Sequence, residues 1–341
     1  MRVLPVVALV TAFAAAPPPA LEWTPLKSGV TVRLRGVSAA SASVAWATGA
    51  NGTILRTTNG GATWTPRPIP GTQALDFRDV DAISSRVAYV LSIGSGAASR
   101  IYRTSDGGAH WTLQFGNTDP KGFFDAMTFR DARRGLAIGD SVDGQFVIVR
   151  TTDGGAVWSR VPAKALPPAL PGEGAFAASG SNIAVLGDAI WIGTGAAKTA
   201  RVLHSADAGR TWTIADTPLA AGASAGIFSI AFRDPKRGIV VGGDYRKEGD
   251  ATGSAAITED GGRTWTAVKG LGGFRSAVAY VPRSRTDVVA VGPSGADVSH
   301  DNGRTWTAIA GPGYDAISFA PDGSVAYATG DGGRIGKLVV R

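Results

Sequence analysis

Arg150–Trp158 reads RTTDGGAVW, and nearly the same stretch occurs at several other places in the chain. Close copies are RTTNGGATW at Arg56–Trp64 and RTSDGGAHW at Arg103–Trp111. One pattern, Ser/Thr-x-Asp/Asn-x-Gly-x-x-Trp, describes six such boxes: Thr57–Trp64, Thr104–Trp111, Thr151–Trp158, Ser205–Trp212, Thr258–Trp265 and Ser299–Trp306. Their tryptophans are 41 to 54 residues apart. Strand-rich repeats of about 40 to 50 residues are typical of β-propellers.

Each repeat has room for four short strands. In the third repeat the expected strands are 126–129, 135–139, 146–151 and 157–161, which are β-branched or aromatic runs bounded by Gly, Asp or Pro. The sequence therefore predicts an all-β fold made of four-stranded blades.

The two ends of the chain predict a seventh blade. The C-terminal segment has three expected strands, at 315–319, 325–330 and 334–340, and no closing Trp strand. The segment LEWTPL at Leu21–Leu26 resembles TWTPRPI at Thr63–Ile69, and Trp23 precedes Trp64 by 41 residues. We expect residues 21–341 to form one seven-bladed propeller whose last blade is closed by the N-terminal strand, because closure removes two free sheet edges.

The boxes are expected to have a structural role in the fold rather than to bind a ligand. An Asp side chain can accept backbone N–H bonds within its own turn, and Gly adopts positive φ without steric cost. The Trp is a large apolar group that can pack between blades. One carboxylate in each turn is too few for a Ca²⁺ site, so a structural role is expected for Asp106, Asp153, Asp207, Asp260 and Asp301.

Composition narrows the class of protein. The 341 residues carry a formal net charge of +7 and no cysteine, which excludes disulfides and thiolate metal sites. There are no Lys/Arg runs of the kind that bind nucleic acid.

Residues 1–20 have a positive start, an apolar run and small residues at Ala16 and Ala20, which predicts a cleaved signal peptide and a periplasmic or extracellular protein. The apolar run is too short to span a bilayer comfortably.

The repeats also carry a family resemblance. The boxes are similar to the Asp-box, or BNR, repeats of sialidases. The fuller units, such as FRDARRGLAIGD at Phe129–Asp140 and FRDPKRGIVVGGD at Phe232–Asp244, resemble the photosystem II stability/assembly factor family and its bacterial relatives. In photosynthetic organisms this resemblance implies a scaffold that helps to assemble a reaction-centre subunit.

A ring alignment of the innermost strands identifies a candidate binding site. Each expected strand begins with an apolar residue, and the residue that follows it is expected to face the central channel. Five of these following residues form a contiguous polar arc: Arg275, Asp315, Arg35, Arg78 and Asp125. Arg presents a planar fork suited to carboxylate or phosphate, so the arc predicts a site for an acidic group of a partner protein or of a small ligand. Alternatively, the charges simply pair with one another.

An enzyme is the second hypothesis. The sequence has no dinucleotide-binding fingerprint in a strand–helix context, which argues against an oxidoreductase. The histidines lie on separate blades, and no metal or cofactor is expected. A sialidase-like glycoside hydrolase stays open, with loop residues Asp140, Glu173, Asp244 and Tyr245 as catalytic candidates. Between the two, the sequence favours an exported, monomeric binding or assembly scaffold.

Overall fold

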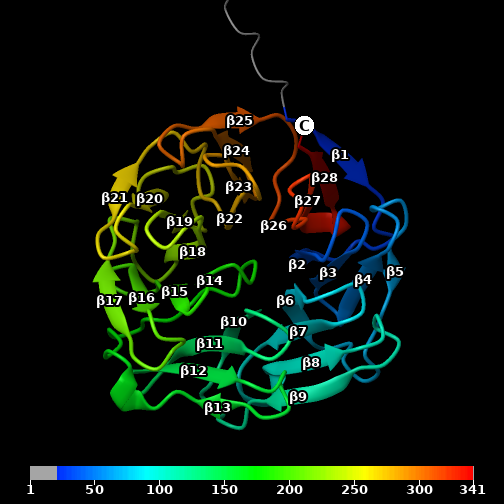
Figure 1. Ribbon diagram of the computed structural model, residues 1–341, viewed down its shortest axis with the longest axis horizontal. Helices are drawn as coiled ribbons and strands as arrows, with labels where there is room; N and C mark the ends of the chain where they lie inside the picture. The colour runs from blue at the N-terminus through cyan, green and yellow to red at the C-terminus, as the bar shows by residue number, and fades with distance from the viewer. Residues whose placement is uncertain (1–20, 341) are drawn as a thin grey trace, which may run out of the picture.

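The structure, a computed structural model, describes residues 21–340. The predicted signal peptide lies outside the described residues. Seven four-stranded antiparallel sheets surround a central axis like the blades of a propeller (Figure 1). No helix in the described part of the chain is long and apolar enough to cross a membrane. The predicted fold class and number of blades are confirmed.

Blades 1 to 4 follow one another along the chain, and in each of them the innermost strand comes first. Blade 1 holds β2 (Leu34–Ala39), β3 (Ala45–Gly49), β4 (Thr53–Thr57) and β5 (Thr65–Pro66). Blade 2 holds β6 (Asp76–Ala82), β7 (Ala88–Ile93), β8 (Arg100–Thr104) and β9 (Thr112–Gly116), with the 3-10 turn η1 (Gly96–Ala98). Blade 3 holds β10 (Phe124–Phe129), β11 (Gly135–Val142), β12 (Gln145–Thr151) and β13 (Ser159–Arg160). Blade 4 holds β14 (Ile183–Leu186), β15 (Ala189–Gly193), β16 (Arg201–Ser205) and β17 (Thr213–Asp216), after η2 (Ala163–Ala165).

Blades 5 to 7 complete the ring. Blade 5 holds β18 (Ala225–Phe232), β19 (Gly238–Asp244), β20 (Ala255–Thr258) and β21 (Thr266–Val268). Blade 6 holds β22 (Ala277–Tyr280), β23 (Val288–Gly292), β24 (Gly295–Ser299) and β25 (Thr307–Ile309). Blade 7 holds β26 (Ala316–Phe319), β27 (Val325–Thr329) and β28 (Ile335–Val339), with η3 (Asp331–Gly333), and its outer strand is β1 (Trp23–Leu26).

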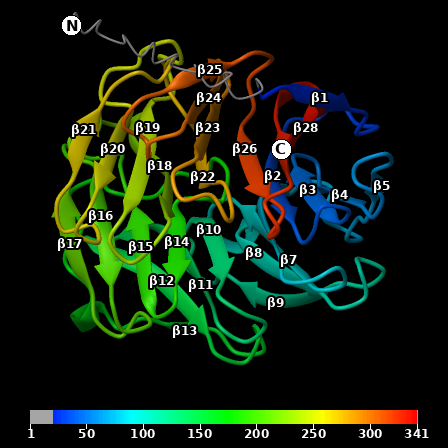
Figure 2. The ribbon, with the colours of Figure 1, turned by 45° about the horizontal axis from the view of Figure 1, so that its top comes forward.

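The N-terminal strand closes the ring as predicted. β1 runs antiparallel to β28, with Trp23 opposite Leu338 and Leu26 opposite Ile335. The two strands lie side by side in both views of the ribbon (Figures 1 and 2). The side chain of Trp23 packs against Tyr314, with the ring centroids 4.6 Å apart. The first and last parts of the propeller are thus joined within one sheet.

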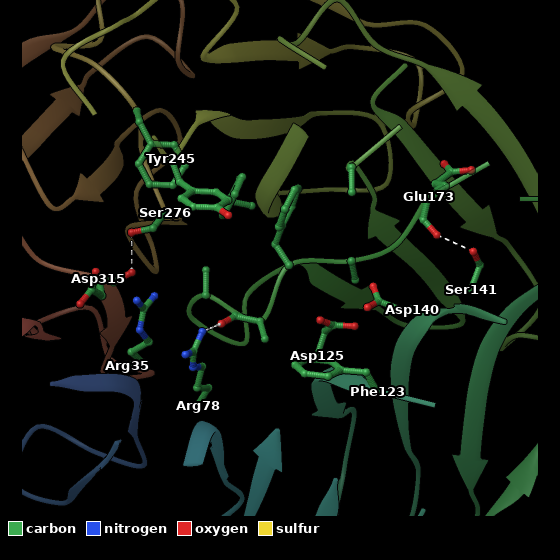
Figure 3. Close-up of a pocket in the computed structure, with 18 of the residues that line it drawn as sticks. Arg35, Arg78, Phe123, Asp125, Asp140, Ser141, Glu173, Tyr245, Ser276 and Asp315 are labelled. Carbon is green, nitrogen blue, oxygen red and sulfur yellow. Dashed lines mark hydrogen bonds between the residues drawn. The ribbon is translucent and has the colours of Figure 1, made fainter. Parts of the chain in front are cut away.

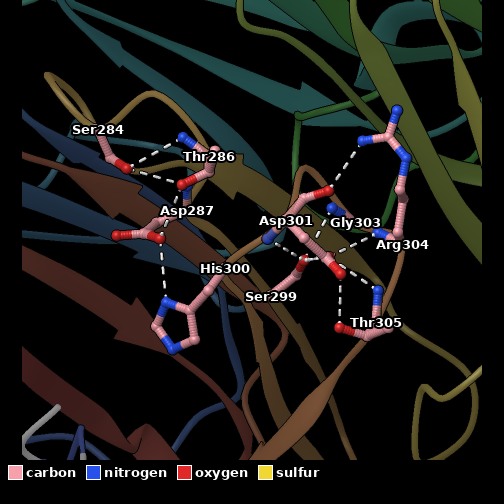
Figure 4. A network of polar contacts seen from close by, with 9 residues as sticks. All are labelled: Ser284, Thr286, Asp287, Ser299, His300, Asp301, Gly303, Arg304 and Thr305. Carbon is pink, nitrogen blue, oxygen red and sulfur yellow. Dashed lines mark hydrogen bonds and ion pairs between the residues drawn. The ribbon is translucent and has the colours of Figure 1, made fainter. Parts of the chain in front are cut away.

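The boxes form turns between the third and fourth strands, on the face opposite the channel mouth. In the sixth box, Oδ1 of Asp301 accepts the Ser299 hydroxyl at 2.8 Å and the N–H of Thr305 at 2.8 Å, while Oδ2 accepts the Thr305 hydroxyl at 2.6 Å (Figure 4). Burial alone would raise the pKa of Asp301, but these bonds lower it to about 2. In the other four Asp boxes the Asp carboxylate likewise accepts the Ser/Thr hydroxyl two residues before it: Asp106, Asp153, Asp207 and Asp260.

Each box Trp packs on the preceding blade. Trp212 of blade 4 lies in one apolar cluster with Leu136, Ile138 and Ile148 of blade 3, and the ring of Trp64 lies 6.0 Å from that of Tyr327 of blade 7. The core is therefore a series of inter-blade layers, each of which buries a large aromatic group.

Side chains on the inner strands also hold neighbouring blades together. Each of them accepts a backbone N–H from the inner strand of the next blade. The pairs are Ser38 with Ala82 at 3.0 Å, Asp81 with Phe129 at 2.7 Å, Ser229 with Val278 at 2.9 Å and Ser318 with Ala39 at 3.1 Å. These bonds fix the register of neighbouring inner strands, which in turn positions the residues at the channel mouth.

Several strand boundaries differ from the expectation; β10, for example, begins at Phe124 and β11 continues to Val142. The outer strand β13 pairs only two residues with β12, because the turn and the inserted Trp158 occupy the positions expected to open that strand. The inner strand of blade 4 begins at Ile183, so Phe176 and Ala177 lie in the loop before it.

Candidate functional site

The inner strands of four blades carry a β-bulge at the channel mouth. The pairing of β2 with β3 skips Arg35, that of β6 with β7 skips Arg78, and that of β10 with β11 skips Asp125. In β18 the skipped residue is Phe228. A bulged residue is released from the alternation of the strand, so its side chain can be re-aimed. The bulges account for why these four side chains face the same space.

That space is a cavity of about 710 Å³ at the mouth of the channel. Four of the five predicted arc residues line it: Arg35, Arg78, Asp125 and Asp315 (Figure 3). The structure therefore brings four of the five arc residues to one cavity.

The arginines at the cavity differ in what they bind. Arg33 makes a bidentate ion pair with Asp315, with nitrogen–oxygen distances of 2.7 and 2.8 Å. Arg78 donates to Asp76 at 2.8 Å and to the carbonyl of Ala177 at 2.9 Å. Some of the arc charges therefore do pair with protein groups, as the alternative reading expected.

Arg35 is the exception. Within residues 21–340 its guanidinium group makes no hydrogen bond and no ion pair. Burial, together with the neighbouring Arg78 and Arg33, lowers the pKa of Arg35 to about 10, against the opposing attraction of Asp315. The group is still cationic at neutral pH, so a positive charge that no described residue pairs with directly faces the cavity.

A pair of carboxyl groups lies on the blade 3 side of the cavity. Asp125 is 2% exposed, and its Oδ2 has no hydrogen-bond partner among the described residues. Asp140, from β11, faces it (Figure 3). Burial, and then repulsion by Asp140, raises the pKa of Asp125 well above its ordinary value. Burial also raises the pKa of Asp140 to about 6.

The opposite side of the cavity is aromatic. Phe176 and Phe228 stack with ring centroids 4.0 Å apart, and Phe274 meets Phe228 edge-on at 4.7 Å. Tyr245 lies at the rim and is 42% exposed. Phe176, Phe228 and Phe274 pack on one another and also line the cavity. The cavity thus combines a charged half with an apolar half.

Arg275 does not join the site, so its predicted place in the arc is wrong. Its side chain is 2% exposed and points into blade 6, where Nε donates to Asp297 at 2.6 Å. The register explains the error. Blades 3 and 6 share one close contact, which aligns them. Gly139 of blade 3 lies against the carbonyl oxygen of Phe123, and Gly292 of blade 6 lies against that of Phe274, since a Cβ added to either glycine would come 2.3 Å from that oxygen. Phe274 is therefore the counterpart of Phe123, and Arg275 that of the buried Phe124.

The four candidate catalytic residues are not grouped as the arc residues are. Glu173 lines the cavity but is 1% exposed, and its carboxylate binds Arg201, the hydroxyl of Thr194 and the N–H of Leu170. Its charge is already compensated. Asp244 lies outside the cavity lining and accepts the N–H of Arg246 at 3.0 Å. Asp140 and Tyr245 remain at the cavity, on opposite sides of it.

Sequence reasoning missed Arg33 and Ser276. In VRLRG, Arg33 lies two residues before Arg35, a spacing that places side chains on one side of an extended segment, and this was a usable signal. Ser276 occupies the cavity position that the alignment gave to Arg275, and its hydroxyl donates to the carbonyl of Asp315 at 2.7 Å. No group of three or more His, Cys, Asp or Glu residues able to hold a metal occurs in the described range.

Comparison with known proteins places the fold. No protein-family profile and no curated protein matches the sequence. Among solved structures, "YCF48 bound to D1 peptide" superposes with a TM-score of 0.67 at 18% identity, covering 94% of this chain and 97% of that one. The chain has the fold of the YCF48 propeller. YCF48 from Cyanidioschyzon merolae superposes with a TM-score of 0.65 at 18% identity, covering 93% of this chain and 99% of that one.

A glycoside hydrolase shares the architecture as well. The GH74 xyloglucanase from Xanthomonas campestris superposes with a TM-score of 0.62 at 15% identity, covering 93% of this chain. This chain spans about half of that enzyme, since the match covers 53% of it. At these sequence identities the comparisons establish the propeller fold alone. The function has to be inferred from the residues of the cavity.

Proposed function

We propose that this protein is an exported binding scaffold whose central cavity takes an acidic group from a peptide segment of a partner protein. The observation that carries the proposal is Arg35, whose guanidinium group lies in a cavity of about 710 Å³ and has no direct partner among residues 21–340. A planar guanidinium group binds a carboxylate through two parallel hydrogen bonds, and partial burial strengthens such bonds. Arg33 and Arg78 add positive potential beside it.

The rest of the cavity suits a peptide rather than a bare anion. The wall formed by Phe176, Phe228 and Phe274 offers apolar contact beside the charged half. Peptide segments supply both kinds of group, since a carboxylate can lie next to an apolar side chain. The similarity to a YCF48 structure that holds a D1 peptide supports a protein partner over a free small molecule.

Export rests on residues 1–20, with their positive start, apolar run and small residues. Mass spectrometry of the protein secreted or released from the periplasm tests this part of the proposal. The mature chain should begin at Pro17 or Leu21. An intact Met1 on protein recovered only from the cytoplasm would contradict export.

Binding is tested by calorimetric titration of the mature chain with pentapeptides that end in a free carboxylate and with the same peptides amidated. The acid forms should bind, and Arg35→Met should weaken them about ten- to a hundredfold, since a bond to a charged group contributes about 1.5–3 kcal/mol. Arg35→Lys should recover only part of the affinity if the contact is bidentate.

Arg86→Met is the matched control, because Arg86 is exposed in the loop between β6 and β7 on the opposite face. It should bind the peptides as the unmodified protein does. Equal affinity for acid and amidated peptides, or an Arg35→Met variant that binds normally, would exclude the carboxylate site.

A further inference from the structure

The carboxyl pair formed by Asp125 and Asp140 is a feature that binding of an acidic group does not use. Both residues line the same cavity as Arg35 (Figure 3). A site built only for anions would gain nothing from two acidic side chains in its wall, because they repel the ligand. Their position therefore calls for a separate explanation.

No Lys, Arg or His side chain among residues 21–340 makes an ion pair with Asp125 or Asp140. The charge of Arg78 acts to lower the pKa of Asp125, but Arg78 donates its hydrogen bonds to Asp76 and to the carbonyl of Ala177. The buried Oδ2 of Asp125 accepts no hydrogen bond from the described residues. Buried polar atoms are rarely left without a partner, and each such atom needs a specific explanation.

A bound metal ion is not the explanation that the donors favour. Only two carboxyl groups meet here, and the described chain brings no third acidic or imidazole ligand to them. Hard divalent cations take six or more oxygen ligands. An ammonium group, by contrast, presents three N–H donors and is satisfied by two carboxylates and water.

We propose that Asp125 and Asp140 form a second subsite, which accepts an ammonium group of the ligand, so that the preferred peptide carries a lysine close to its carboxylate. This inference rests on the proposed function, in which Arg35 holds the carboxylate. The two subsites lie on neighbouring blades, with Arg35 on blade 1, Arg78 between them on blade 2, and Asp125 on blade 3. The aromatic wall then takes the apolar part of the same segment.

The electrostatic arrangement supports this specificity. Arg35 is cationic, and the acid pair is negative at neutral pH because Asp140, with a pKa of about 6, is ionised there. A ligand with a single charge therefore meets attraction at one end and repulsion at the other. A ligand with both charges is attracted at both ends. Such complementarity selects among peptides by rejecting the singly charged ones.

The test compares two sets of acetylated pentapeptides with a free C-terminal carboxylate. One set has lysine one, two or three positions before the C-terminus, and the other has norleucine, which keeps the length of the side chain without its charge. Each is titrated into the mature chain, into Asp125→Asn/Asp140→Asn and into Arg35→Met. At least one lysine peptide should bind the unmodified protein about ten times more tightly than its norleucine match, the effect of one charged hydrogen bond.

The variants separate the two proposals. Asp125→Asn/Asp140→Asn should abolish the preference for lysine while keeping the norleucine peptides bound, and Arg35→Met should weaken both sets. Asp140→Asn alone, at the less buried member of the pair, provides the same readout should the double variant not fold. Equal binding of lysine and norleucine peptides, with the effect of Arg35→Met intact, would overturn the ammonium subsite alone. Failure of both sets to bind, or indifference to Arg35→Met, would overturn the carboxylate site and this inference with it.

Discussion

Asp79 shows how a single buried carboxyl group links two blades and makes stability depend on pH. It is 5% exposed on β6, and its Oδ2 accepts the N–H of Met127 on blade 3 at 2.7 Å. Its other oxygen lies so near Gly180 that a Cβ there would come within 2.1 Å of it. Burial raises the pKa of Asp79 to about 8, with a smaller contribution from Asp81 and against the Met127 N–H.

The pKa of Asp79 predicts that the protein loses stability as pH rises from 6 to 8. In this range the folded state holds a proton on Asp79 that the unfolded chain, with an ordinary pKa near 4, has already lost. The free energy of unfolding should therefore fall with pH, by up to about 1.4 kcal/mol per pH unit for a fully titrating group. Denaturant unfolding at several pH values measures the slope.

Asp79→Asn keeps an oxygen acceptor for Met127 and removes the charge, so it should flatten the slope and raise stability at pH 8. Asp216→Asn, a change at an exposed residue on β17, is the control and should leave the slope as it is. An unchanged slope in Asp79→Asn would show that Asp79 is ionised throughout this range.

At the scale of the element, the box turn is the unit that repeats. Asp301→Ala removes the acceptor of four bonds, from the hydroxyl of Ser299, from the N–H of Arg304 and from the N–H and hydroxyl of Thr305 (Figure 4). We expect a loss of about 1 kcal/mol in the free energy of unfolding, and unchanged peptide affinity because the turn lies on the face opposite the cavity. Thermal or denaturant unfolding, with titration of the same peptide, checks both.

The first box supplies the control for this substitution. Asn59 occupies the Asp position there, and its side-chain oxygen accepts the Thr57 hydroxyl and the N–H of Thr63, both at 3.0 Å. Asp301→Asn should therefore be tolerated better than Asp301→Ala. Loss of peptide binding by a stable Asp301→Ala protein would instead make the box part of a site.

The inner strands show what sequence can and cannot predict at this scale. Repetition of the boxes was enough to find the blades, because turn chemistry and a large Trp recur at a fixed spacing. Alignment also placed Arg35, Arg78 and Asp125 correctly, since each follows a buried apolar residue. It failed by one residue in blade 6, where Arg275 takes the position of that apolar residue and pairs with Asp297.

The carboxyl pair could not be predicted from the sequence, for a different reason. Asp125 and Asp140 were both candidates, but one was assigned to the arc and the other to a loop. Their juxtaposition depends on the bulge at Asp125, which moves its side chain out of the alternation of β10. A bulge adds one residue without a distinctive residue type at this position, so neither hydrophobic periodicity nor turn chemistry reveals it.

At the scale of the whole molecule, ring closure depends on a strand that lies at the other end of the chain. Trp23 is 9% exposed and packs with Tyr314, Leu338 and residues of blade 6 such as Val298 in one apolar cluster. It is the seventh member of the set of blade tryptophans, and the only one supplied by a segment that is distant in sequence from the rest of its blade. Cooperative unfolding of the ring should therefore be sensitive to this residue.

Trp23→Ala should lower the free energy of unfolding by about 3–5 kcal/mol, the range for truncating a large buried aromatic side chain. Thr24→Ala is the matched control, since Thr24 is exposed on the same strand and makes no side-chain bond within residues 21–340.

Deletion of Leu21–Leu26 should lower the free energy of unfolding more than Trp23→Ala does, because it also frees the edge of β28, which pairs with four residues of β1 in the intact protein. An exposed edge also favours association through strand pairing, so the deleted protein should form oligomers in sedimentation at concentrations where the unmodified chain stays monomeric. A deletion variant that is monomeric and unfolds at the original temperature would show that six blades and an incomplete seventh suffice, and that the N-terminal strand does not hold the ring closed.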